Sequence, residues 1–196
     1  MIGILMAAGF SRRFGASNKL MHALPDKTPM ALAAAQNLIT AVPLSIAVVR
    51  AENTALADML RQAGLHIALC TEDEQVMADS LATAIRYAAN FTEAKHGFVI
   101  ALADMPYIKP ASISAIAHAV SCGAGIAIPT FNGQRGHPVG FAAKFRNELA
   151  QVSGDEGARA VVKRHAHAVQ LIACDDAGIL ADIDTPADLE SLPQAS

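Results

Sequence analysis

Residues 2–9 read Ile-Gly-Ile-Leu-Met-Ala-Ala-Gly, and this opening stretch decides how the rest of the sequence is interpreted. Residues 2–7 form an unbroken apolar run that Gly9 closes. A short apolar run without polar alternation is typical of a strand that is buried on both faces of a parallel sheet. We therefore expect the chain to begin with such a strand, followed by a polar loop that runs to Lys19.

Short apolar runs then alternate with longer segments of helical periodicity. Further strands are expected at residues 44–49, 67–69, 97–103, 125–129, 139–141 and 169–173. Helices are expected at residues 30–39, 53–63, 81–89, 110–120, 144–150 and 158–164, and after Pro186, with Asn53 as an N-cap, Asp79 or Ser80 as another, and Gly64 as a stop. This alternation predicts a single α/β domain over residues 1–196 with a mostly parallel sheet, in which ligands bind beyond the carboxyl ends of the strands.

Composition excludes several classes of protein. The 196 residues carry 15 Lys and Arg against 18 Asp and Glu, and 53% of them are hydrophobic. Such a chain can bury a large core, and its mild acidity argues against a nucleic-acid partner. No apolar run approaches the ~20 residues of a membrane span. Cys70, Cys122 and Cys174 lack the spacing of metal ligands, so we expect reduced, packed thiols in a cytoplasmic protein.

The loop after the first strand has the residue types of a phosphate site. Ala7, Ala8 and Gly9 are small enough to let backbone N–H groups approach a ligand. Arg13 and Lys19 supply two cations that could meet phosphate oxygens. The loop lacks the Gly-Lys-Ser/Thr of P-loop enzymes and the three spaced glycines of the dinucleotide fingerprint. The alternative interpretation is a solvated turn with scattered charges.

Two acidic sites follow. Asp104 comes directly after the buried run at 97–103, where a carboxylate needs either a partner or a wet cleft. The second site holds Asp182 and Asp184, ahead of Pro186. As alternatives, Asp104 could serve a turn and Asp184 an N-cap. Two carboxylates about 4 Å apart repel by about 4 kcal/mol at an effective dielectric constant of about 20, and a Mg²⁺ ion would remove that penalty.

Two glycine-punctuated loops form the third group of candidates. The first, at 133–138, contains His137, which could donate to a substrate oxygen, although a lone histidine is more often structural. The second, at 154–159, ends in Arg159. A cation that opens a helix lies at the unfavourable end of the helix dipole, which suggests that Arg159 contacts an anion.

These motifs together resemble a known family over nearly the whole chain, from residue 2 to about residue 192. The motifs are Ala-Ala-Gly-x-Ser-x-Arg-x-Gly at 7–15, Leu-x-Asp-x-Pro at 102–106, Gly-x-x-Gly-His-Pro at 133–138, Gly-Asp-x-Gly-Ala-Arg at 154–159 and Asp-Ile-Asp-Thr-Pro-x-Asp-Leu at 182–189. They resemble the MobA-like nucleotidyltransferases, and most of all the molybdenum cofactor cytidylyltransferase (MocA-like) branch. Met105 departs from the pattern, since Gln is usual there.

The resemblance implies a Rossmann-like three-layer sandwich and transfer of a nucleotidyl group from an NTP, with Mg²⁺, onto a phosphate. By motif, the nucleotide would be held by Ala7, Ala8, Gly9, Ser11, Arg13, Lys19 and Ser80. The catalytic residues would be Arg13, Lys19 and Asp104; the metal ligands Asp104 and Asp184; and the pterin contacts His137 and Arg159. Since a phosphate monoester is already ionised near neutral pH, the reaction needs charge neutralisation and positioning rather than a covalent nucleophile.

The resulting hypothesis is a cytidylyltransferase that joins CMP from CTP to the phosphate of molybdopterin or molybdenum cofactor and releases pyrophosphate. A molybdoenzyme that accepts the cofactor, or its chaperone, is the expected protein partner. The alternatives are a GTP-using guanylyltransferase, a sugar-phosphate or alditol-phosphate nucleotidyltransferase, and a non-catalytic nucleotide-binding cofactor chaperone.

Overall fold

The apolar opening run forms β1 (Ile2–Met6), the strand on which the site is built. The computed structural model describes residues 1–9, 19–71, 77–154, 156–183 and 188. β1 pairs in parallel with β2 (Ser45–Arg50) and with β4 (Phe98–Leu102), and β2 pairs in parallel with β3 (His66–Cys70). All five residues of β1 are buried, as expected of a strand covered on both faces.

The other half of the sheet contains an antiparallel insertion. The strand order is β3-β2-β1-β4-β7-β5-β6, and β8 also pairs with β5. The short β7 (Val139–Phe141) runs antiparallel to both β4 and β5 (Ile126–Phe131). β6 (Gln134–Arg135) is antiparallel to β5, and β8 (Val169–Ala173) is parallel to it. The expected mostly parallel sheet is confirmed, and β7 and the two-residue β6 are the strands that run in the opposite direction.

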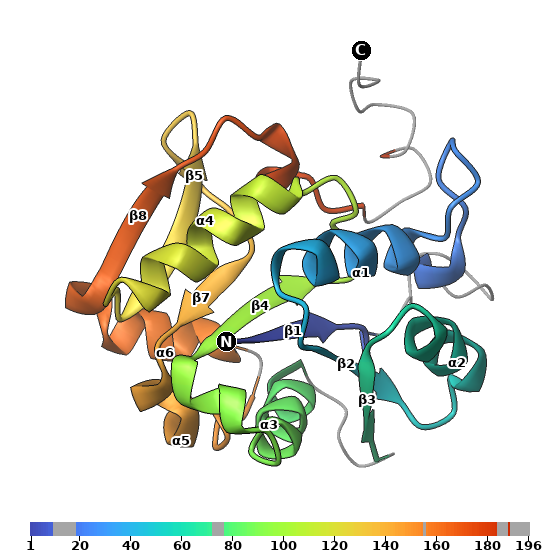
Figure 1. The fold of residues 1–196 in the computed structure, drawn as a ribbon, viewed down its shortest axis with the longest axis horizontal. Coiled ribbons are helices and arrows are strands. Elements are labelled where there is room, and N and C mark those ends of the chain that lie inside the picture. The colour runs from blue at the N-terminus through green and yellow to red at the C-terminus, as the bar shows by residue number, and fades with distance from the viewer. Residues whose placement is uncertain (10–18, 72–76, 155, 184–187, 189–196) are drawn as a thin grey trace.

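Helices cover both faces of the sheet and make three layers (Figure 1). One face packs on α1 (Met30–Ala41), α2 (Thr54–Gln62) and α4 (Pro110–Ser121). The other packs on α3 (Met77–Ala88), α5 (Arg146–Leu149) and α6 (Ala158–Arg164). Successive strand side chains alternate between the two faces: Leu5 of β1 belongs to the first core and Ile4 to the second. The remaining short helical turns are η1 (Lys19–Met21), η2 (Thr92–His96), η3 (Ala143–Phe145), η4 (Ala166–Ala168) and η5 (Ala177–Leu180).

Three local expectations need correction. The helix expected at 81–89 begins at Met77, so Asp79 and Ser80 lie inside α3 rather than at an N-cap position. The helix expected at 144–150 is split into η3 and α5. Asn53 does stand at the N-cap position of α2, but its side chain makes no capping hydrogen bond. Gly64 follows α2 with a φ of 102°, which supports its expected role as a stop. The helix expected after Pro186 falls outside the described residues.

The expectation of packed thiols holds for Cys70 and fails for Cys122. Cys70 is 1% exposed, whereas Cys122 lies exposed just after α4, with its Sγ atom 3.4 Å from Nε2 of His118. Cys174 has intermediate exposure, so full burial accounts for Cys70 alone. Within the described ranges, the structure contains no helix of the length and hydropathy needed to cross a membrane.

Candidate active site

The site lies at the carboxyl edge of β1 and β4. These neighbouring parallel strands are in register through Met6 opposite Leu102, so the residues that follow each strand leave the sheet side by side. Ala7 and Ala8 are buried, and Gly9 is exposed at the end of the described segment. The expected phosphate loop and Asp104 therefore start from adjacent positions at the edge where α/β sheets bind ligands.

Lys19 and Asp104 form an ion pair at this edge. Lys19 begins η1 and is only 8% exposed, although it is a lysine. Its Nζ atom donates to Oδ2 of Asp104 at 3.1 Å, across 85 positions of sequence. The Lys19 side chain is 10% exposed and that of Asp104 29%, so the carboxylate still reaches solvent. Two charges that the sequence assigned to a triphosphate and to its metal are thus in contact.

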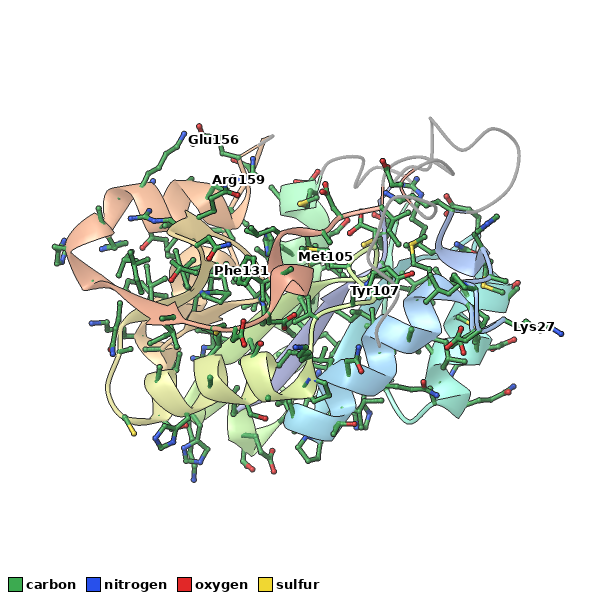
Figure 2. The ribbon with its side chains drawn as sticks, turned by 90° about the horizontal axis from the view of Figure 1, so that it is seen from above. Lys27, Met105, Tyr107, Phe131, Glu156 and Arg159 are labelled. Carbon is green, nitrogen blue, oxygen red and sulfur yellow. The ribbon has the colours of Figure 1, made fainter. Side chains whose placement is uncertain are left out.

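The loop that carries Asp104 is tied to its surroundings. The backbone oxygen of Asp104 accepts from the N–H of Ile183 at 3.0 Å, and the amide of Asn37 on α1 donates to the carbonyl of Pro106 at 2.9 Å. Met105 is 4% exposed within the first core, which explains an apolar residue at a position where the family usually has Gln. Tyr107, labelled in Figure 2, lies against the short turn η5, since a Cβ on Gly178 of that turn would lie 2.2 Å from the carbonyl oxygen of Tyr107.

His137 lies close enough to three charged residues for them to affect its pKa. Burial is the main cause that lowers the pKa of His137, and the Arg159 guanidinium lowers it further, whereas Asp104 and Asp182 act in the opposite direction. The ring therefore stays neutral near pH 7. Its backbone N–H donates to the carbonyl of Ile179, whereas its buried Nδ1 atom contacts no hydrogen-bond partner among the described residues. Buried polar atoms usually have a hydrogen-bond partner, so Nδ1 of His137 is a candidate contact for a ligand.

The second glycine loop brings α6 against α3. Gly157 is the buried N-cap residue of α6, and a Cβ there would lie 3.8 Å from Cα of Ala78. Arg159, in the first turn of α6, is exposed and stands near Glu156 in Figure 2. Ser80 is 3% exposed inside α3, so its expected contact with the nucleotide stays a prediction.

Three of the expected ligands lie in segments outside the described residues, namely Ser11, Arg13 and Asp184. Of the second acidic motif, Asp182 is described and is exposed. The described residues contain no cluster of three His, Cys, Asp or Glu side chains that could hold a metal. The carboxylates expected to bind metal, Asp104 and one from the second acidic motif, still fit Mg²⁺. This ion commonly binds through one or two carboxylates together with substrate phosphates and water.

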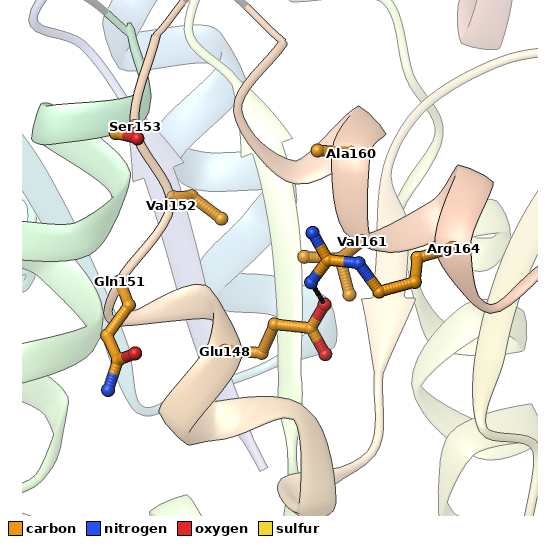
Figure 3. Close-up of a pocket in the computed structure, with 7 residues that line it drawn as sticks. All are labelled: Glu148, Gln151, Val152, Ser153, Ala160, Val161 and Arg164. Carbon is orange, nitrogen blue, oxygen red and sulfur yellow. Dashed lines mark hydrogen bonds and ion pairs between the residues drawn. The ribbon is translucent and has the colours of Figure 1, made fainter.

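A separate hollow of about 220 Å³ lies between α5 and α6 (Figure 3). It is lined by Glu148, Gln151, Val152, Ser153, Ala160, Val161 and Arg164. Glu148 pairs with Arg164 across it and also with Nε2 of His165, at 2.8 Å. The hollow contains none of the expected site residues, and its opposite charges already neutralise each other.

Sequence reasoning missed Asp176. This carboxylate is 3% exposed and connects α4 with η5, the turn that also contacts His137. In the sequence it is the second of two adjacent aspartates in an ordinary polar turn. Only its burial distinguishes it from Asp175, and no local pattern indicates burial there.

The fold places a Lys–Asp pair at the edge where α/β proteins bind ligands, and comparison with known proteins assigns the chain to a class of nucleotide-transferring enzymes. The family model described as the MobA-like NTP transferase domain matches residues 3–169. The chain belongs to this family of nucleotidyltransferases. A curated relative is the purine catabolism protein PucB of Bacillus subtilis (strain 168), which is 27% identical over 205 residues, covering 100% of this chain and 97% of PucB.

Solved structures share the fold. Rv0371c from Mycobacterium tuberculosis H37Rv superposes with a TM-score of 0.82 at 26% identity, over 96% of this chain and 94% of that one. A second structure of Rv0371c, in complex with manganese, has a TM-score of 0.77 at 24% identity, covering 97% and 98% of the two chains. A nucleotidyl transferase from Methanothermobacter has a TM-score of 0.77 at 16% identity, over 95% and 93% of the chains, and shows the fold alone.

Proposed function

We propose that the chain is a cytoplasmic, Mg²⁺-dependent cytidylyltransferase that transfers CMP from CTP to the phosphate of molybdopterin or molybdenum cofactor. Residues 1–196 would act as one catalytic domain. The observation that carries the proposal is the Lys19–Asp104 pair, 3.1 Å apart beside the small residues that follow β1. The MocA-like motifs of the sequence favour CTP and the molybdenum cofactor as the particular substrates.

The reaction forms one P–O bond and breaks another. An oxygen of the acceptor phosphate bonds to the α-phosphorus of CTP, and the bond from that phosphorus to the bridging oxygen breaks, so that pyrophosphate leaves with its electron pair. Both reactants are anionic, and positive charge around them is the main requirement for catalysis. A bound divalent cation supplies part of that charge, and we assign Asp104 and one of Asp182 or Asp184 as its protein ligands.

The chain's own residues have distinct roles in this proposal. The backbone at Ala8 and Gly9 approaches the phosphates, while Lys19 and Arg13 neutralise them. Lys19 exchanges its contact with Asp104 for phosphate oxygens when the nucleotide enters. His137 and Arg159 bind the acceptor, the neutral ring through hydrogen bonding and the guanidinium through charge.

The proposal is tested by pyrophosphate release with purified molybdopterin and each of CTP, GTP, ATP and UTP. Mg²⁺ and Mn²⁺ are compared, since Rv0371c forms a complex with manganese. We expect release that requires both CTP and molybdopterin. Faster release with GTP would assign a guanylyltransferase, and nucleotide binding without any release would favour the chaperone alternative.

A matched pair of variants connects the reaction to the site. Asp104→Asn is expected to abolish release while the protein stays folded. Asp58→Asn is the control, because Asp58 is an exposed aspartate on α2 that pairs with nearby Arg61. If Asp104→Asn and Asp58→Asn have the same rate as the unmodified protein, the assignment of Asp104 is wrong.

A further inference from the structure

Asp176 is a buried carboxylate that accepts three hydrogen bonds. Its Oδ2 atom accepts from the backbone N–H of Lys109 at 2.8 Å and from the hydroxyl of Ser112 at 2.6 Å. Its Oδ1 atom accepts from the N–H of Gly178 at 3.0 Å. A carboxylate that is 3% exposed is tolerated only when its oxygens are satisfied in this way.

Through these contacts Asp176, which is more than 60 residues away in the sequence, accepts hydrogen bonds from the N-terminus of α4. Lys109 is the N-cap residue of α4, and its own side chain makes no capping hydrogen bond. In a capping box, a Glu or Gln at the third helical position accepts from the N-cap N–H. Here the third position is Ser112, and Asp176 accepts both from Ser112 and from the N-cap N–H. A negative charge at this end also suits the helix dipole.

Asp176 is the first residue of a segment that crosses the active site, which we name the strap (residues 176–183). The carbonyl of Ile179 in the strap accepts from the backbone N–H of His137 at 2.9 Å. The N–H of Ile183, at the end of the strap, donates to the backbone oxygen of Asp104 at 3.0 Å. Asp182, which affects the pKa of His137, lies between these two contacts. The strap therefore contacts both parts of the site.

The strap lies against neighbouring backbone with little free space. A Cβ on Gly178 would lie 2.2 Å from the carbonyl oxygen of Tyr107, in the loop after Asp104. A Cβ on Gly136 would lie 2.2 Å from the carbonyl oxygen of Ile179. Because both glycines allow backbone to approach backbone, a shift of the strap must move these loops or break the contacts.

We propose that Asp176 is a positioning residue of the active site. By fixing the start of the strap to α4, it sets where Asp104, Asp182 and His137 stand relative to one another. The functional part of this inference rests on the proposed nucleotidyl transfer, whereas the mechanical part does not. Asp176 touches neither substrate, so its removal should change how well the reactants are oriented.

The experiment compares Asp176→Ala and the milder Asp176→Asn, which keeps one acceptor oxygen, with the control Ser45→Ala. Ser45 is also fully buried and donates one hydrogen bond, to the carbonyl of Val42 at 2.7 Å, at the start of β2 and away from the carboxyl edge. Circular dichroism selects a temperature at which every variant is folded. Amide hydrogen exchange then follows residues 134–138 and 176–183, and steady-state kinetics give kcat and KM.

Asp176→Ala is expected to exchange at least about 10-fold faster in both segments. Its kcat/KM for CTP and molybdopterin should fall by about 10- to 100-fold, because small misplacements of reacting groups are costly. Asp176→Asn should lie between Asp176→Ala and the unmodified protein. Ser45→Ala should have a lower Tm, with exchange in these two segments and kcat/KM unchanged.

The outcomes separate this inference from the proposed function. If Asp176→Ala only lowers the Tm, with unchanged exchange at 134–138 and unchanged kcat/KM, Asp176 merely caps α4 and the inference is overturned. If the unmodified protein has no transferase activity, the proposed function fails and the exchange data alone decide whether Asp176 positions the strap. Should Asp176→Ala not fold, the same criteria apply to Asp176→Asn.

Discussion

Replacing the two members of the Lys19–Asp104 pair, singly and together, should reveal a coupling well above that of a surface ion pair. At the observed separation of 3.1 Å, the Coulomb attraction is about 5 kcal/mol for an effective dielectric constant of about 20. Desolvation of the nearly buried Lys19 offsets much of this attraction. The Asp104 side chain is 29% exposed, which screens the pair further. We therefore expect a net coupling of about 1–2 kcal/mol.

The measurement is a double-mutant cycle of Lys19→Met and Asp104→Asn, read out as the free energy of unfolding in urea. Each single variant should lose about 2 kcal/mol of stability, and in a chain of 196 residues this corresponds to a Tm lower by about 4–8 °C. The matched control is the cycle of Arg61 and Asp58, whose side chains are 56% and 63% exposed. Its coupling should be below about 0.5 kcal/mol. If the two cycles give equal coupling, the ion pair does not organise the site.

Three further predictions concern the same edge of the sheet. Because burial lowers the pKa of His137 below its usual 6.5, the unfolded chain binds this proton more readily than the folded protein, and stability should fall as the pH drops from about 6.5 to the folded pKa. His137→Gln should flatten that part of a plot of Tm against pH, and a plot that the substitution leaves unchanged would contradict the burial of the ring. Gly178→Ala and Gly136→Ala should each cost about 1–3 kcal/mol of unfolding free energy, since the added methyl would lie 2.2 Å from a carbonyl oxygen; a neutral effect in urea denaturation would show that the strap yields easily. Gly9→Ala should leave the Tm unchanged, because a Cβ there meets no described atom within 4 Å. The same substitution should raise the KM for CTP, and an unchanged KM would argue against a phosphate at this loop.

The sheet was largely predictable because its strands are buried on both faces. Residues 2–7, 97–103 and 139–141 are apolar runs without alternation, and each coincides with a strand to within one residue at either end. The reversed direction of β7 left no local mark, since a three-residue apolar run has the same composition in either orientation. Strand direction follows from how the chain connects in space.

The site was predictable in its residue types and less so in its supports. Lys19 and Asp104 each follow a strand that the sequence predicts to be buried. Because these two strands pair in parallel, the two side chains come within 3.1 Å of each other although they are 85 positions apart in the sequence. His137 and Arg159 also proved to be electrostatic neighbours. Asp176 was missed because its partners come from α4 and from backbone, so no short motif contains them.

The most direct test of the proposed site is a crystal structure of the unmodified protein with a non-hydrolysable CTP analogue and Mg²⁺. We predict that the triphosphate lies at the carboxyl edge of β1, within hydrogen-bond distance of Lys19 Nζ and of the backbone N–H groups that follow Ala7, with the cation on Asp104. A nucleotide bound elsewhere, for instance in the hollow between α5 and α6, with Lys19 and Asp104 still paired to each other, would contradict it.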